Sequence, residues 1–316
     1  MTVADPPLRK PSPASWLFNQ PYLMLSLMSL FWAMNIVLGR FVAGHVPPFA
    51  LTFCRWAGTF LVLAPFAWPY LVRDWPVIRR KLPLLLLLAF TGFAFNNALS
   101  YWGLQHTQAL NALLIQSSGP LFVALWSLML FGVRLSWTQA AGIFVSLLGV
   151  LVIVLRGDLA ALAAIQVNAG DISFAGALFV FGLYSALMPK RPRISPLSLI
   201  AFTTGAGAVM LVPLVGWEVS TGETLTFDTL TVSTVVFVVL FPSTLAYIFF
   251  NRGIELIGPN RAAPFFHLVP VFGSVMAIML LGEKPELFHL VGYVLVLAGI
   301  FTASRRGSAG TRPASR

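Results

Sequence analysis

Ten apolar stretches, separated by short polar segments, run along the chain between residues 21 and 304. Each is close to the roughly 20 residues that an α-helix needs to cross a hydrocarbon core about 30 Å thick. None alternates apolar and polar positions as the strands of a membrane barrel do, so the pattern predicts an all-α bundle of membrane-spanning helices. The predicted spans are 21–42, 48–70, 83–105, 109–131, 136–156, 170–189, 196–217, 229–250, 260–281 and 287–304.

The segments outside these spans predict two short tails. Residues 1–20 are polar and proline-rich, and they carry Arg9 and Lys10. The apolar stretch that follows is too long for the core of a signal peptide and has no convincing cleavage site, so we expect it in the mature protein. Residues 305–316 form the second tail.

Composition supports a membrane location. Of the 316 residues, 58% are hydrophobic and only 9% are charged, and the mean hydropathy is +0.86. Soluble domains carry about 25% charged residues, so this chain has too few to cover a water-facing surface. Its single cysteine, Cys54, excludes an intramolecular disulfide and any metal cluster held by cysteines.

The basic residues predict the orientation of the bundle. The formal net charge is +10, and 16 of the 20 Lys and Arg residues fall on the side that holds both tails. Three fall on the other side, and Arg55 lies inside the second span. Because short cytoplasmic loops retain Lys and Arg, we expect a multi-pass protein of the inner (plasma) membrane with both tails in the cytoplasm. The basic residues form no clustered patch with stacking aromatics, so nucleic-acid binding is not expected.

Glycine and proline positions predict an internal duplication. Six small or proline residues recur at an offset of 150 residues, and two prolines recur at an offset of 148. The pairs are Gly103 and Gly253, Ala112 and Ala262, Pro120 and Pro270, Gly132 and Gly282, Gly142 and Gly292, Gly149 and Gly299, Pro48 and Pro196, and Pro65 and Pro213. A constant register over this many pairs is hard to obtain by chance. We therefore expect two five-helix repeats, residues 21–156 and 157–304.

An odd number of helices in each repeat requires the second repeat to enter the membrane upside down. Charge supports this inversion. Residues 71–82, between the second and third spans, carry four basic side chains, whereas the corresponding residues 218–228 carry three acidic side chains and no base. Inverted repeats recur in secondary transporters, in which two halves move around a central site. A duplicated bundle with no transport role is the weaker alternative.

Three runs of residues resemble a known family. FWAMNIVLGRF (31–41), HTQALNALLIQSSGPLF (106–122) and NRGIELIGPNRAAPFFHLVPVFGSVMAIMLLGEKP (251–285) are similar to the duplicated EamA-type modules of the drug/metabolite transporter superfamily. The resemblance covers about residues 20–304. It implies a ten-helix transporter with a central cavity between two five-helix halves, often an exporter of amino acids or other small metabolites.

One position departs from the family pattern. Glu283 follows Gly282, as the pattern LGE expects, but Val133 follows Gly132 in the first repeat. A contact made by Glu283 is therefore not expected to be duplicated.

Pro120 and Pro270 mark two inner helices. A proline inside a helix removes one backbone hydrogen bond and bends the axis. In a membrane such a break is tolerated where protein or water lines the helix. We expect both prolines to act as hinges in helices that line the cavity, and a simple packing kink is the alternative interpretation.

Polar and aromatic side chains inside the spans supply a candidate substrate site. Amides and phenols can hydrogen-bond a polar ligand, while aromatic rings form the apolar walls of a small-molecule pocket. The candidates are Trp32, Asn35, Asn97, Tyr101, Gln116, Phe181, Tyr184, Tyr247, Asn251 and His267. For each amide alone, a hydrogen bond between helices is the alternative role.

Arg55 lies about 12 Å inside the second span, at 1.5 Å per residue. A charge at this depth is costly unless it faces water, carbonyl groups or an anion. No Asp or Glu lies at a comparable depth, since every acidic residue maps to a tail, a loop or a helix end. Two interpretations stay open: Arg55 bonds backbone carbonyls structurally, or it attracts a substrate carboxylate.

The lack of a carboxylate deep in the spans favours transport down the substrate gradient without a coupling ion. His267 is the only group inside a predicted span, away from its ends, whose unperturbed pKa is near neutrality. No GxxxxGK[ST] phosphate-binding loop occurs, so ATP is not expected to drive transport. No cofactor or metal is expected, and the expected partners are a small-molecule substrate and the lipid bilayer.

These features predict secondary export of small metabolites, amino acids or related compounds, by alternating access between the two repeats. A carrier of nucleotide sugars or phosphorylated metabolites with the same fold is the nearest alternative, although it would need several basic residues in the cavity. An intramembrane enzyme or a structural membrane protein is an alternative from another class. An enzyme is not expected, because no HExxH motif or evident Ser–His arrangement occurs.

Overall fold

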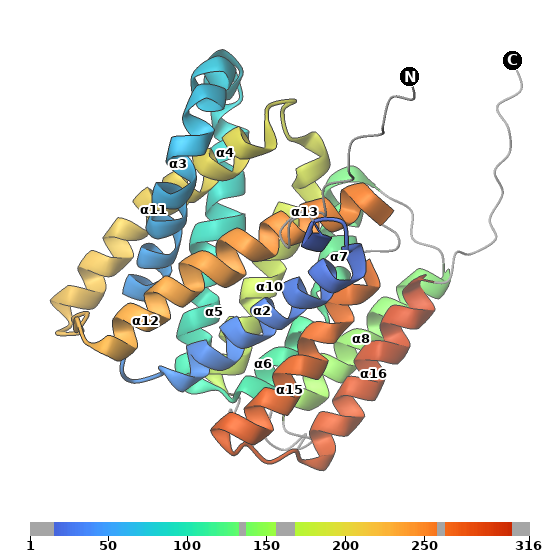
Figure 1. The fold of residues 1–316 in the computed structure, drawn as a ribbon. Coiled ribbons are helices and arrows are strands. Elements are labelled where there is room, and N and C mark those ends of the chain that lie inside the picture. The colour runs from blue at the N-terminus through green and yellow to red at the C-terminus, as the bar shows by residue number, and fades with distance from the viewer. Residues whose placement is uncertain (1–15, 133–136, 156–167, 258–262, 305–316) are drawn as a thin grey trace, which may run out of the picture.

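The computed structural model describes residues 16–132, 137–155, 168–257 and 263–304, and no strand occurs among them. Their helices lie side by side as a bundle (Figure 1). In chain order the helices are α2 (Pro21–Phe41), α3 (Pro48–Arg80), α4 (Leu82–Ala89), the π-helix η1 (Phe90–Ala94), α5 (Phe95–His106), α6 (Ala109–Gln116), α7 (Gly119–Phe131), α8 (Trp137–Val154), α10 (Ala169–Leu187), the 3-10 helix η2 (Met188–Lys190), α11 (Pro196–Ser220), α12 (Thr229–Val238), the π-helix η3 (Val239–Leu245), α13 (Ala246–Ile257), the 3-10 helix η4 (Ala263–His267), α15 (Leu268–Leu281) and α16 (Leu287–Ser304).

The predicted apolar stretches coincide with these helices. Six helices are long and apolar enough to cross a membrane, and counting the bent pair of α6 and α7 as one span raises the number to seven. The other predicted spans correspond to shorter apolar helices, at Ala140–Ile153, Phe265–Leu281 and Leu287–Gly299. The described residues thus form an all-helical membrane bundle with six or seven full-length spans, where the sequence predicts ten.

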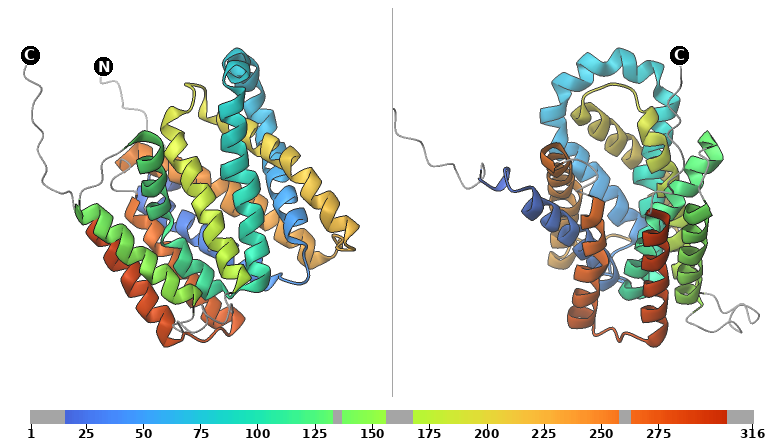
Figure 2. Two further views of the ribbon diagram at one scale, coloured as in Figure 1. Left: turned by 180° about the vertical axis from the view of Figure 1, so that it is seen from behind. Right: turned by 90° about the vertical axis from the view of Figure 1, so that its right-hand side faces the viewer.

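The helix α3 continues ten residues beyond the predicted end of its span. The apolar pattern ends near residue 70 because Arg73 and its neighbours are polar. Hydropathy reports where the chain leaves the lipid, and a helix can continue beyond that point. Three prolines, Pro65, Pro69 and Pro76, lie inside the helix on its exposed side. Interior prolines bend a helix, and α3 curves over toward α4 at its end (Figure 2).

The antiparallel helices α3 and α11 cap each other. Asp74, near the end of α3, accepts hydrogen bonds from the Ser195 N–H at 2.8 Å and the Ser198 hydroxyl at 2.7 Å, where α11 begins. Glu218, near the end of α11, accepts one from the Ala50 N–H at 2.7 Å, where α3 begins. First-turn N–H groups have no partner within their helix, and negative charge is favourable beside them. The two carboxylates therefore stabilise both helix starts and hold the pair in register.

Glycines let two further helix pairs approach closely. A Cβ atom on Gly149 of α8 would lie 2.7 Å from the carbonyl oxygen of Gly292 in α16, and one on Gly292 would lie 2.9 Å from that of Gly149. Gly103 of α5 and Gly170 of α10 meet in the same reciprocal way. Small residues at such crossings bring backbones together, which is how many membrane helices associate. The contact between α8 and α16 is the most extensive of any helix pair in the described residues.

The bundle has two distinct ends (Figure 1 and Figure 2). The start of α2 and the ends of α7 and α16 lie toward one end, which we call the tail end. The opposite end, the pocket end, holds the end of α5, the starts of α6, α10 and α16, and the link between α2 and α3. The first and last described helices therefore begin and finish at the same end of the bundle.

Candidate functional site

Arg55 of α3 lies in the interior of the bundle and is only 5% exposed. Its Nε donates a hydrogen bond to Ser243 Oγ at 2.6 Å, and its Nη1 donates to Asn97 Oδ1 and Tyr101 Oη, both at 3.2 Å. The Tyr101 hydroxyl in turn donates to Asn35 Oδ1 at 2.6 Å. Residues of α5 and η3 therefore meet at the guanidinium of α3, and Tyr101 links them to α2. We call these five residues the Arg55 cluster.

The hydrogen-bond partners of Arg55 in the described residues are all neutral. In the described part of the chain the ion pairs are His45 with Asp228, Arg73 with Asp74, and Arg252 with Glu255. The Arg55 guanidinium also lies 4.5 Å from the centre of the Trp56 ring, whose face attracts a cation. The interpretation that Arg55 bonds backbone carbonyls is wrong for these contacts, because its three partners are side-chain oxygens. Among the described residues, no hydrogen bond uses its Nη2 group.

Two π-helical turns supply partners to the cluster. Ser243 lies in η3 and donates to Val238 O at 2.7 Å, while Asn97 follows η1 and donates to Phe93 O at 3.0 Å. Each π turn leaves carbonyl groups without their usual α-helical partner, and these side chains satisfy them. Such turns occur frequently at functional sites. The sequence analysis missed both, although Gly92 and Pro242 interrupt the two helices 150 residues apart.

Aromatic rings form one side of the same region. The Trp32 ring lies 5.9 Å from that of Tyr247, centre to centre, and its Nε1 donates to the Pro242 carbonyl in η3 at 3.0 Å. On the other side of Arg55, the Trp56 ring contacts that of Phe93, and the Phe93 ring contacts that of Tyr184, at 4.9 and 5.8 Å. The Tyr184 ring also contacts that of Phe181, at 5.4 Å. Of the ten predicted substrate residues, Asn35, Asn97 and Tyr101 thus belong to the Arg55 cluster by hydrogen bonds. The rings of Trp32, Phe181, Tyr184 and Tyr247 lie around it.

The other three predicted residues lie apart from the cluster. Gln116 is the last residue of α6, and His267 is the last residue of η4. Asn251 is exposed on α13. No hydrogen bond or ring contact in the described residues joins any of them to Arg55.

The two predicted hinge prolines differ in their place along a helix. Pro120 is the second residue of α7, after a break at Ser117 and Ser118, and the α6–α7 pair bends there by 44°. First-turn N–H groups have no partner within the helix, so Pro120 begins a helix and does not break one from within. Pro270 lies inside a helical segment, because the 3-10 helix η4 runs directly into α15 and the apolar helix extends over Phe265–Leu281. A role of either proline in gating stays a prediction.

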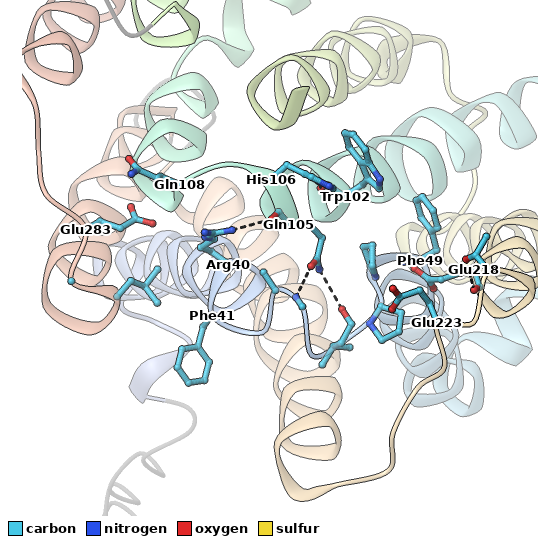
Figure 3. Close-up of a pocket in the computed structure, with 18 of the residues that line it drawn as sticks. Arg40, Phe41, Phe49, Trp102, Gln105, His106, Gln108, Glu218, Glu223 and Glu283 are labelled. Carbon is cyan, nitrogen blue, oxygen red and sulfur yellow. Dashed lines mark hydrogen bonds between the residues drawn. The ribbon is translucent and has the colours of Figure 1, made fainter. Parts of the chain in front are cut away.

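A pocket of about 1080 Å³ opens at the pocket end (Figure 3). Its walls come from the link between α2 and α3, the ends of α5, α11 and α15, and the segments before α6 and α16. Arg40 lies in this wall and donates from Nη1 to the carbonyls of Leu104 and Gln105, both at 3.1 Å, at the end of α5. None of the predicted substrate residues lines this pocket.

The acidic side chains of the pocket are held by helix starts. Glu283 accepts hydrogen bonds from the N–H groups of Ala109 and Leu110, at 2.7 and 2.8 Å, where α6 begins. Val133, the first-repeat counterpart, lies outside the described residues. At the same end, Asp228 accepts from the Thr231 N–H at 2.8 Å, and this hydrogen bond lowers the pKa of its carboxyl.

Acidic residues lie in loops or at helix ends, as predicted, but some of these positions are buried. Asp171 lies in the first turn of α10 and yet is fully buried, and Glu218 is only 3% exposed. His289 of α16, not considered in the sequence analysis, is buried as well, at 4%. Helix ends in this bundle are thus covered by neighbouring helices. Among the described residues, no group of three or more His, Cys, Asp or Glu could hold a metal ion.

Comparison with known protein families shows to which family the chain belongs. The model of the EamA-like transporter family matches residues 19–155 and again residues 168–305. The chain belongs to the EamA-like transporter family. This EamA protein is therefore a multi-pass membrane transporter.

Relatives of this EamA protein include transporters named for a probable substrate class and uncharacterised transporters. The uncharacterized transporter YyaM of Bacillus subtilis is 26% identical over 290 residues, which cover 90% of this chain and 93% of YyaM. A probable terminal-alkyne amino-acid exporter of Streptantibioticus cattleyicolor is 30% identical over 237 residues, 75% of this chain and 77% of that protein. A probable amino-acid metabolite efflux pump of Salmonella typhimurium is 28% identical over 296 residues, 87% and 91% of the two chains.

A solved crystal structure has the same fold as this EamA protein. It aligns with a TM-score of 0.60 at 19% identity, over 90% of this chain and 98% of its own. At this identity the likeness is one of fold alone.

Proposed function

We propose that this transporter exports small metabolites that carry a carboxylate, amino acids or related compounds, and that the Arg55 cluster binds them. The observation that carries the proposal is a buried guanidinium whose contacts in the described residues are all to neutral groups. A substrate carboxylate would supply the negative charge and accept a hydrogen bond from Nη2. Trp32 and Tyr247 would form the apolar wall. Two relatives have names that refer to amino-acid or amino-acid metabolite export.

The proposed cycle is alternating access by two inverted repeats of five spans each, residues 21–156 and 157–304. Three observations support this architecture. The family matches twice, and the π turns η1 and η3 begin 149 residues apart. The helix pairs also correspond: α5 packs on α10 of the other repeat, and α13 packs on α2. A pseudo-two-fold axis between two inverted halves would relate these two helix pairs to each other. Halves related in this way move about a site near the bilayer midplane.

A carrier of nucleotide sugars or phosphorylated metabolites is the second candidate. Phosphate groups are bound by several Lys or Arg side chains together. In the described interior of the bundle, Arg55 is the buried cation, and the other contacts of its cluster are amides and hydroxyls. This composition favours one carboxylate over a phosphate group.

Purified protein in liposomes tests the proposed substrate class. Counterflow is measured with radiolabelled amino acids, with a nucleotide sugar and with a sugar phosphate, each against liposomes without protein. We expect exchange of one or more amino acids and none of the phosphate compounds. Exchange of phosphate compounds alone would favour the second candidate, and a folded protein that exchanges none of these solutes would contradict the proposal.

Orientation is tested by cysteine labelling in intact cells. With Cys54→Ala as the parent, Ser12→Cys and Ser308→Cys should each resist a membrane-impermeant maleimide until the cells are lysed. The reason is the excess of Lys and Arg on the side that holds both tails. A cysteine in the loop at Gly222, at the pocket end, should react without lysis and serves as the control. Labelling of either tail from outside would refute the proposed orientation.

A further inference from the structure

A second buried polar group lies at the pocket end, on α6, α10 and α16. Asn111 Nδ2 donates to both carboxylate oxygens of Asp171, at 3.1 and 3.0 Å, and the Thr107 hydroxyl donates to the same carboxylate. His289 Nε2 lies 2.9 Å from Asn111 Oδ1. Asp171 and Asn111 are fully buried, and Thr107 is 3% exposed. We call these four residues the Asp171 network.

The hydrogen bonds define the tautomer of His289. The Glu286 N–H donates to His289 Nδ1 at 2.8 Å, so this nitrogen carries no proton. In the neutral imidazole the proton is on Nε2 and is donated to Asn111 Oδ1. The Asn111 amide also donates to the Asp171 carboxyl group, so one amide joins a histidine to a buried acidic side chain.

The network connects the two proposed repeats. Thr107 and Asn111 belong to the first, and Asp171 and His289 belong to the second. A proton on the Asp171 carboxylate would remove an acceptor of the Asn111 amide, and with it a bond between α6 and α10. A proton on His289 Nδ1 would displace the Glu286 N–H at the start of α16. Protonation thus weakens contacts at the pocket end, and deprotonation restores them.

The pocket gives the network a route to solution. Gln108 and Glu286 both line the pocket. Gln108 is next to Thr107 in the chain, and the Glu286 backbone is bonded directly to His289. Residues of the pocket wall are therefore joined directly to the network, through the chain and through one hydrogen bond.

Other charged or titratable groups surround the network. They are Glu283, Lys284 and Glu286 before α16, Tyr293 on α16, Tyr101 and His106 on α5, and Arg40 on α2; the described residues of α7, α8 and α15 contribute none. Glu283 is bonded to the start of α6 and Arg40 to the end of α5, so both are engaged elsewhere. Tyr101 is buried like Asp171 and His289, but its hydroxyl is bonded to Arg55 and Asn35 in the Arg55 cluster.

We infer that the Asp171 network is a proton-binding site that couples export of the substrate to entry of a proton. This inference rests on the proposed transport function. In each cycle the network binds one proton from the solution at the pocket end and releases it to the solution at the tail end. The expectation of uncoupled export depended on the lack of a buried carboxylate, and Asp171 removes that ground.

A pH jump in the absence of substrate tests the site directly. Protein in liposomes is adsorbed on a solid-supported membrane, and the outer solution is switched to lower pH. A proton that binds within the low-dielectric interior displaces charge, so we expect a transient current from the parent protein. Asp171→Asn keeps the shape of a protonated carboxyl and should reduce the current to that of protein-free liposomes. His289→Gln should do the same, and it serves as the second variant if Asp171→Asn does not fold.

The matched control is His45→Gln. His45 is an exposed titratable residue at the same end, 2.7 Å from Asp228, and its loss should leave the transient current unchanged. No current from the folded parent protein would overturn the inference. A current that persists in either folded network variant would overturn it as well.

A steady-state experiment separates proton coupling from transport itself. Liposomes with a clamped membrane potential receive a radiolabelled amino acid that passes the counterflow test, together with a pH gradient. Exchange of one proton for one substrate should build a substrate gradient of up to about tenfold for each pH unit. In Asp171→Asn the pH-driven gradient should disappear, whereas it should persist in His45→Gln. Counterflow without any pH-driven gradient in the parent would reject coupling and leave the proposed function standing.

Discussion

Arg55→Gln is expected to weaken binding of a carboxylate-bearing substrate by roughly 10- to 100-fold, because a charge-assisted hydrogen bond contributes about 1.5–3 kcal/mol. In the structure Arg55 is buried, and Ser243, Asn97 and Tyr101 hold its guanidinium in one orientation. Glutamine is too short to reach the same position and carries no charge. The measurement is the half-saturation concentration for counterflow in liposomes.

Two comparisons distinguish binding from a structural role of Arg55. Arg55→Lys keeps the charge and loses the planar fork of donors, so its affinity should fall between those of the parent and Arg55→Gln. The amide of the same amino acid lacks the carboxylate, and its weaker binding should be insensitive to the substitution. If Arg55→Gln weakened acid and amide equally, or only lowered the thermal stability of the protein, carboxylate recognition would be rejected.

Gly149→Ala is expected to lower the free energy of unfolding by about 1–3 kcal/mol, the usual effect of overpacking. The added Cβ would lie 2.7 Å from the Gly292 carbonyl oxygen and 2.8 Å from the Val296 nitrogen. Both are backbone atoms of α16, so the clash can be relieved only by moving one helix away from the other. Since α8 and α16 join the two proposed repeats, we also expect a lower yield of monodisperse protein.

The matched control for this glycine is Gly216→Ala in α11. A Cβ atom at Gly216 meets no atom within 4 Å. There the substitution should raise the free energy of unfolding slightly, by about 0.4–1 kcal/mol, because it restricts the unfolded chain. Unfolding in mixed detergent micelles measures both variants. Equal stability of the two would contradict the close helix contact at Gly149.

The apolar pattern of the sequence determined where the helices are. In lipid, every backbone polar group must be satisfied within the chain, so a long apolar stretch has few conformations open to it. This is why the predicted stretches coincide with helices. It also explains the main error at Arg80, where α3 ends ten residues after the apolar pattern does. The position of Arg55 inside a span likewise predicted a polar partner, since an isolated buried charge is costly.

The tertiary structure alone decided which polar residues meet. Ser243 is 188 residues from Arg55, and Asp171 is 60 residues from Asn111, so no local pattern relates them. The two π turns differ in this respect, because their carbonyls are satisfied locally: Asn97 bonds the carbonyl four residues before it, and Ser243 bonds the one five residues before it.

The tertiary structure also decided which helix ends are buried. The sequence placed Asp171 and His289 near the ends of their spans, where water is the usual surrounding. In the folded bundle, crossing helices cover both residues, and the hydrogen bonds to Asn111 satisfy them there. Hydropathy is a property of one segment, whereas burial at a helix end depends on the neighbours that cover it. For this reason the spans could be predicted from the sequence, and the Asp171 network could not.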